Sequence, residues 1–135
     1  MENYFDIQLD KKQVDAITNL GLAHMGDGIY ELLVRTHLCC RGDKTVKKLH
    51  KETVELVNAA SQAAFAEKLL PHLTEEERSA FTRGRNAKPH STPKHCSLRE
   101  YALATGLECL FGTLYLKGET QRVLELWQMA LEVLA

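Results

Sequence analysis

The chain has 135 residues, enough for one domain with a hydrophobic core of its own. Its composition, 44% hydrophobic and 26% charged with few glycines and prolines, excludes collagen-like and disordered chains. The net charge of −1 does not indicate a nucleic-acid-binding protein, so any such function must come from a local cluster. No run reaches the roughly 18 apolar residues of a membrane span, and the N-terminus resembles neither a signal nor a transit peptide. A cytoplasmic protein is expected.

The four cysteines have no zinc-finger or disulfide-framework spacing. They stand at positions 39, 40, 96 and 109, and no C-x-x-C pair occurs. Reduced, mostly packed thiols are therefore expected. One alternative stays open, in which Cys39, Cys40, Cys96 and a histidine such as His95 converge on a metal ion.

Helical periodicity dominates the chain, and no run of alternating β-branched residues indicates a strand. The pattern predicts an all-α fold, with residues 1–135 as a single domain. Gly42 is expected to end the second helix and Pro71 the third. The helices are expected at 11–19, 21–40, 43–70 with a candidate break near Asn58, from 74 onward, from 97 to Gly118, and at 119–135.

Two capping boxes mark helix starts in the second half of the chain. Thr74 with Glu77, and Ser97 with Glu100, have the spacing at which side chain and backbone hydrogen-bond reciprocally. Residues 88–96, KPHSTPKHC, hold two of the three prolines and are expected to form a loop between these helices.

Two acidic residues stand within apolar parts of two predicted helices. The segment 20–38 is apolar on two faces, which predicts a buried helix with Asp27 inside one of the faces. Glu108 is the only charged residue in 103–116. An ionised carboxylate in a dry interior must protonate, pair or bind a cation. Both acids could share Mg²⁺, which takes oxygen ligands and substrate phosphate, so metal-assisted phosphodiester hydrolysis is a hypothesis.

The structural alternative is that the two acids form salt bridges with Arg35, Arg85 or Arg99. Gly28 also needs an explanation, because glycine inside a helix costs about 1 kcal/mol relative to alanine. It either permits close helix packing or backbone approach to a site, or is simply tolerated.

A basic segment without any Asp or Glu runs from Arg83 to Arg99. Such a patch can neutralise phosphates, and double-stranded RNA is recognised largely by shape, phosphate and 2′-hydroxyl contacts. A solvated loop is the alternative. A further basic run, Lys44 to Lys51, is interpreted as a soluble helix face, with a secondary RNA contact as the other possibility. The candidate RNA-binding residues are Arg83, Arg85, Asn86, Lys88 and Lys94.

Four blocks of the sequence together resemble Mini-ribonuclease III, the stand-alone relative of the ribonuclease III catalytic domain. They are 22-LAHMGDGIYELLVR-35, 83-RGRNAK-88, 92-TPK-94 and 104-ATGLECLFGTLYL-116. The resemblance implies a ribonuclease III-like helical homodimer that cleaves double-stranded RNA with Mg²⁺ and has no separate double-stranded-RNA-binding domain. It also implies maturation of the ends of the large-subunit (23S) ribosomal RNA precursor, and it leaves open whether a ribosomal protein assists.

Within this resemblance, Asp27 matches the last acid of the first ribonuclease III motif and Glu108 the last acid of the second. The other motif acids fall on Leu20, Ala23 and Thr105, a reduced pattern that the subfamily shares and that leaves the number of metal ions open. Glu31 or the Thr105 hydroxyl could assist through water. Two departures are Gly28, where the family commonly has Ala, and Ala102, where a basic residue is usual.

The implied reaction is in-line attack of an activated water on a phosphodiester, giving a 5′-phosphate and a 3′-hydroxyl. Asp27 and Glu108 would hold Mg²⁺, the basic loop would bind the duplex, and Met25, Ile29 and Leu32 are candidates for part of the dimer contact. Two rival functions are a non-catalytic RNA-binding ribosome-assembly factor on the same fold, and a helical interaction protein without an RNA partner.

Overall fold

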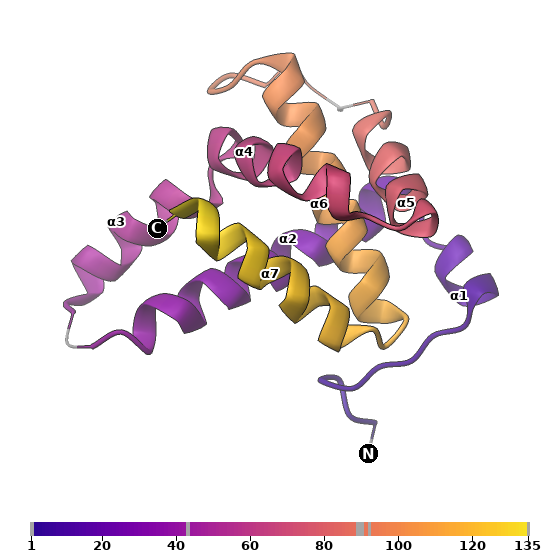
Figure 1. Cartoon of the computed structure of the whole chain (residues 1–135), viewed down its shortest axis with the longest axis horizontal. Coiled ribbons are helices and arrows are strands. Elements are labelled where there is room, and N and C mark those ends of the chain that lie inside the picture. Colours follow the sequence, from indigo (N-terminus) through magenta and orange to yellow (C-terminus); the bar gives the residue numbers. More distant parts are fainter. Residues whose placement is uncertain (1, 43, 89–90, 92, 135) are drawn as a thin grey trace.

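The computed structural model describes residues 2–42, 44–88, 91 and 93–134, and these residues form helices and connections with no strand (Figure 1). This confirms the predicted all-α fold. Across the same residues, no helix combines the length and the hydropathy that crossing a bilayer requires. The α-helices are α1 (Lys11–Asp15), α2 (Asn19–Cys39), α3 (Val46–Val57), α4 (Ala59–Leu69), α5 (Glu75–Arg85), α6 (Leu98–Leu116) and α7 (Thr120–Leu134), with a 3₁₀ turn η1 (Leu70–His72).

Polar side chains cap the helix starts. The two predicted capping boxes form: Thr74 opens α5 and Ser97 opens α6, each with the reciprocal bond from the glutamate three residues on. Asn58 leaves helical geometry with ψ of 159° and accepts a hydrogen bond from the Ser61 backbone N–H. The segment expected at 43–70 is therefore two helices, α3 and α4, broken at the candidate position.

Helix α6 runs through the centre of the molecule and packs against α2, α4, α5 and α7 (Figure 1). Every residue from 103 to 114 is buried except Glu108, which is partly exposed. A helix covered on all sides cannot have a polar stripe, which explains why this segment contains one charged residue.

The main core is built around Tyr30 of α2, which is 1% exposed. Its ring lies 5.8 Å from Phe65 of α4, 6.2 Å from Phe111 of α6 and 5.8 Å from Trp127 of α7, measured between ring centroids. The Tyr30 hydroxyl donates to the Leu56 carbonyl oxygen at 3.0 Å, so a polar group at the end of this buried ring is satisfied.

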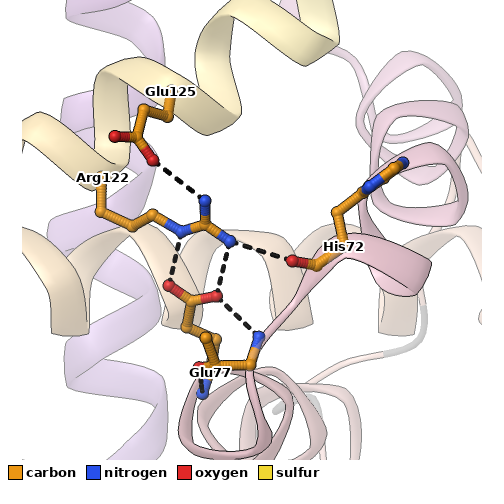
Figure 2. A network of polar contacts seen from close by, with 5 residues as sticks. His72, Glu77, Arg122 and Glu125 are labelled. Atoms are coloured by element: carbon orange, nitrogen blue, oxygen red, sulfur yellow. Dashed lines mark hydrogen bonds and ion pairs between the residues drawn. The ribbon is translucent and has the colours of Figure 1, made fainter.

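An ion-pair network joins α7 to the start of α5 (Figure 2). The Arg122 guanidinium donates to both carboxylate oxygens of Glu77, at 2.8 and 3.0 Å, to the His72 carbonyl oxygen and to Glu125. Burial alone would raise the pKa of Glu77, but the hydrogen bonds from Arg122 and Thr74 outweigh it, and the pKa lies below its usual value. The Glu77–Arg122 pair therefore stabilises the fold at pH values above the lowered pKa of Glu77.

We expect Arg122→Met to lower the free energy of unfolding by about 2–3 kcal/mol at pH 7, because it leaves the Glu77 side chain, only 8% exposed, without its charged partner. Since a lowered pKa contributes stability that is lost as pH falls through the folded value, the difference from wild type should shrink at pH 3. Urea unfolding at both pH values measures it. Lys11→Met, which breaks an exposed pair screened by solvent, is the control, and its expected loss is much smaller. Equal losses in the two variants at pH 7 would contradict the prediction.

Candidate active site

Asp27 of α2 and Glu108 of α6 face each other where these two helices pack. The two carboxyl groups are within hydrogen-bonding distance. Burial, followed by the nearby charge of Asp27, raises the pKa of Glu108 to about 8. Glu108 is therefore protonated at neutral pH in the metal-free protein.

The expectation that Asp27 is buried is wrong. Asp27 and Gly28 are exposed, and so is Leu32 on the face expected to be covered, at 49%. Residues of a helix follow each other at about 100°, and the buried arc of α2 is centred near Gly26 and Tyr30. Asp27 lies at the edge of that arc, where its carboxylate can reach both Glu108 and solvent.

The alternative in which structural salt bridges explain both acids is also wrong. Arg35 pairs with Glu31 at 3.4 Å and Arg99 pairs with Glu67 at 2.6 Å. No ion pair within the described part of the chain includes Asp27 or Glu108. The carboxyl pair is therefore not neutralised by a basic side chain in this structure.

Gly26 brings the two helices close enough for the acids to meet. A Cβ placed on Gly26 would lie 1.6 Å from the carbonyl oxygen of Glu108, and one placed on Gly112 would lie 2.0 Å from that of Leu22. The backbones of α2 and α6 thus touch directly at the site. This role was not predicted from the sequence, although glycines in two apolar helices, one of them next to Asp27, were the available signal.

Gly28 has no packing role. A Cβ placed on it meets nothing within 4 Å, which leaves simple tolerance as its explanation. We expect Gly28→Ala to raise the free energy of unfolding by about 1 kcal/mol, because alanine restricts the unfolded chain and favours the helix. Urea unfolding measures this, and a loss of stability would contradict it.

Two further buried side chains, Gln62 and Tyr30, lie near Glu108, and no sequence pattern indicated the first. Gln62 of α4 is 3% exposed, and its amide is within hydrogen-bonding reach of the Glu108 carboxyl. Tyr30 lies close enough that burial, with the charge on Glu108 added, raises the pKa of its hydroxyl above the usual value. The site is thus contributed by α2, α4 and α6.

The chemistry of these groups fits a hard divalent cation better than zinc. The two carboxylates supply oxygen ligands only, and Mg²⁺ commonly binds through one or two carboxylates while keeping several waters. The described residues contain no group of three or more His, Cys, Asp or Glu side chains suited to a metal. All four cysteines are free; only Cys109 is buried, while Cys39 and Cys40 are exposed. The structure thus gives no support to the zinc alternative or to mostly packed thiols.

The candidate RNA-binding residues begin on a helix and not in a loop, which corrects the sequence prediction. Arg83 and Arg85 lie in the last turn of α5, where basic side chains complement the helix dipole. A Cβ on Gly84 would lie 2.4 Å from Cys109 Cβ, so this turn packs on α6 next to Glu108. Arg83, Arg85, Asn86, Lys88 and Lys94 are all exposed.

Other residues named in the sequence prediction either lie outside the described residues or already have a hydrogen-bond or ion-pair partner. Thr92 of the TPK block lies outside the described residues. Arg99 is paired with Glu67, and Lys44 with Glu52 at 2.6 Å. Both basic side chains therefore already have a carboxylate partner. Of the candidate auxiliaries, Glu31 pairs with Arg35, and the buried Thr105 hydroxyl donates to the Tyr101 carbonyl oxygen at 2.8 Å.

The raised pKa of Glu108 predicts a pH-dependent stability. Between about 4.5 and about 8 the folded protein keeps a proton that the unfolded chain has lost, so this contribution is present below pH 4.5 and disappears as pH rises through 8. We expect metal-free Glu108→Gln to match wild type at pH 4 and to exceed it by about 5 kcal/mol at pH 9. Urea unfolding in EDTA tests this, and parallel pH profiles for the two proteins would contradict it.

Comparison with known proteins defines the class to which this fold and site belong. The ribonuclease III domain matches residues 20–119. A crystal structure of a protein from Fusobacterium nucleatum superimposes with a TM-score of 0.80 at 28% identity, over 87% of this chain and 94% of that one.

Two relatives identify the family within this class of proteins. The Mini-ribonuclease 3 of Symbiobacterium thermophilum is 46% identical over 82% of this chain and 85% of its own length. That of Clostridium tetani is 36% identical over 98% of this chain and 89% of its own. The chain therefore belongs to the Mini-ribonuclease 3 family of ribonuclease III domain proteins, and it is an endoribonuclease. This confirms the resemblance found in the sequence.

Proposed function

We propose that the protein is a Mg²⁺-dependent endoribonuclease that cleaves double-stranded RNA, with Asp27 and Glu108 as its catalytic and metal-binding residues. The observation that carries this proposal is the contact between the two carboxyl groups, which no basic side chain of the described residues neutralises. A partly buried pair of acids in this state is suited to a divalent cation. Family membership supports the same reaction class.

The side chains of the pair would act together. Asp27, at the exposed edge of α2, and Glu108, half-buried on α6, would hold the cation through their carboxylates, and Glu108 would give up its proton to do so. When bound, Mg²⁺ supplies a water of lowered pKa and offsets charge on the phosphate oxygens. In-line hydrolysis of the phosphodiester would leave a 5′-phosphate and a 3′-hydroxyl.

The exposed side chains after Gly84 would bind the RNA backbone. Gly84 packs tightly on α6 at Cys109, the residue that follows Glu108, and Arg83 and Arg85 flank it in the chain. Guanidinium groups offer planar donors to phosphate oxygens, and Asn86, Lys88 and Lys94 follow in the chain. Each lost phosphate contact should reduce the salt dependence of duplex affinity.

The remaining parts of the proposal come from the family resemblance. The substrate would be the precursor of the large-subunit (23S) ribosomal RNA in the cytoplasm, with a ribosomal protein as a further partner to test. The protein would act as a homodimer, and the exposed Leu32, with Met25 and Ile29 beside it on α2, is a candidate part of the contact. A two-fold dimer would place one site on each RNA strand.

Incubation of the purified protein with a long RNA duplex, in Mg²⁺ or in EDTA, tests the function. We expect cleavage in Mg²⁺ only, products with 5′-phosphates, and no cleavage of either strand alone. A precursor stem compared with an unrelated duplex of equal length tests the substrate. Intact duplex that nevertheless binds the protein would favour the alternative, a non-catalytic ribosome-assembly factor, and absence of binding would refute both.

A further inference from the structure

Gln62 is a buried polar side chain with an unsatisfied atom. The residue is 3% exposed, on α4. Its Nε2 group donates to the Val57 carbonyl oxygen at 2.8 Å, across the break between α3 and α4. Its Oε1 atom is buried and accepts no hydrogen bond from any described residue. Leaving a buried acceptor unpaired is costly, because the atom has given up its hydrogen bonds to water, so an arrangement of this kind requires an explanation.

The orientation of the Gln62 amide is determined by its neighbour. A carbonyl oxygen at 2.8 Å requires the nitrogen of the amide and not the oxygen, because two oxygens at that separation would repel. The amide also lies close to the Glu108 carboxyl, across the contact between α4 and α6. Gln62 is thus placed where it can hold that side chain in position.

The position of Gln62 is rigid. The Tyr30 hydroxyl donates to Leu56 and the Gln62 amide to Val57, so two buried side chains bind adjacent carbonyl oxygens at the end of α3. On α4 the neighbouring Ala63 and Ala66 are buried in the core. A side chain held at its base by core packing and at its tip by a backbone bond is well suited to orient another group.

We propose that Gln62 is a positioning residue of the metal site, which holds the Glu108 carboxylate in place through Nε2 and leaves Oε1 for a donor that arrives with the cation. A water of the hydration shell is such a donor, since Mg²⁺ keeps several waters when bound. This inference rests on the proposed function, because it requires that Asp27 and Glu108 bind a divalent cation. Partners of metal ligands typically change affinity about 10–100-fold when they are removed.

The test is Mn²⁺ binding to the purified full chain, measured by electron paramagnetic resonance of the free ion, with Mg²⁺ as competitor. Gln62→Met has nearly the same length and helix propensity but neither donor nor acceptor. Gln62→Asn keeps the amide but is one methylene too short. Thr53→Val is the matched control. It removes a buried polar group elsewhere, the Thr53 hydroxyl, which donates to the Leu49 carbonyl oxygen within α3 at 2.8 Å. The free energy of unfolding in EDTA is measured for all of them.

We expect Mn²⁺ affinity to fall about tenfold in both Gln62 variants and to stay unchanged in Thr53→Val. Gln62→Met should keep its metal-free stability, because it also removes the unsatisfied Oε1. Unchanged affinity in the Gln62 variants, or loss of folding in both, would overturn the proposal and make Gln62 a structural residue. If Asp27→Asn binds Mn²⁺ as tightly as the wild type does, the proposed metal site itself is refuted, and the inference with it.

Discussion

Replacing Asp27 with Asn, or Glu108 with Gln, will reduce cleavage of duplex RNA by about 10³-fold or more. Each substitution removes a charged ligand from a pair that has no other neutralising partner among the described residues. Metal ions contribute several kcal/mol of transition-state stabilisation, and each 1.4 kcal/mol corresponds to about a tenfold change in rate. The measurement is the single-turnover cleavage rate at saturating Mg²⁺.

Both variants should fold and bind RNA. Asp27 is exposed, so Asn is accommodated there. Gln at position 108 replaces a half-buried ionisable group with a neutral one of the same shape, which removes the cost of burying a charge. Circular dichroism and duplex affinity in EDTA check this. Glu55→Gln, which neutralises an exposed carboxylate on α3, is the control and should cleave like wild type. Rapid cleavage by Asp27→Asn would mean that the chemistry takes place elsewhere.

Gly26→Ala will destabilise the protein by about 3 kcal/mol or more. The added Cβ would lie 1.6 Å from the Glu108 carbonyl oxygen and 2.4 Å from its carbon, and backbone atoms cannot rotate away as a side chain can. The helices α2 and α6 must separate, and the contacts of the most enclosed part of the core loosen with them. Urea unfolding measures the loss.

Gly28→Ala is the matched control for this substitution. It makes the same chemical change two residues along the same helix, where nothing lies within 4 Å of the new Cβ. The helix propensity gained is the same in both variants, so the difference between them isolates the contact of α2 with α6. Similar stabilities for the two variants would show that the helices can separate without loss.

Much of this protein could be predicted from sequence because the relevant physics is local. The capping boxes at Thr74 and Ser97, and the break at Asn58, depend on side chains and backbone within three or four residues. Glu108 stood out because a central helix leaves no polar stripe, and the order of the four sequence blocks indicated the family that the comparisons confirm.

The tertiary structure alone decided how the site is assembled. Whether Asp27 is buried depends on which arc of α2 the other helices cover, and no periodicity within α2 specifies that arc. The contact made by Gly26, and the approach of Gln62 to Glu108, join residues that are far apart in the chain. Local sequence determines where a helix starts and ends. Packing between helices determines which of its side chains meet and how burial changes their pKa values.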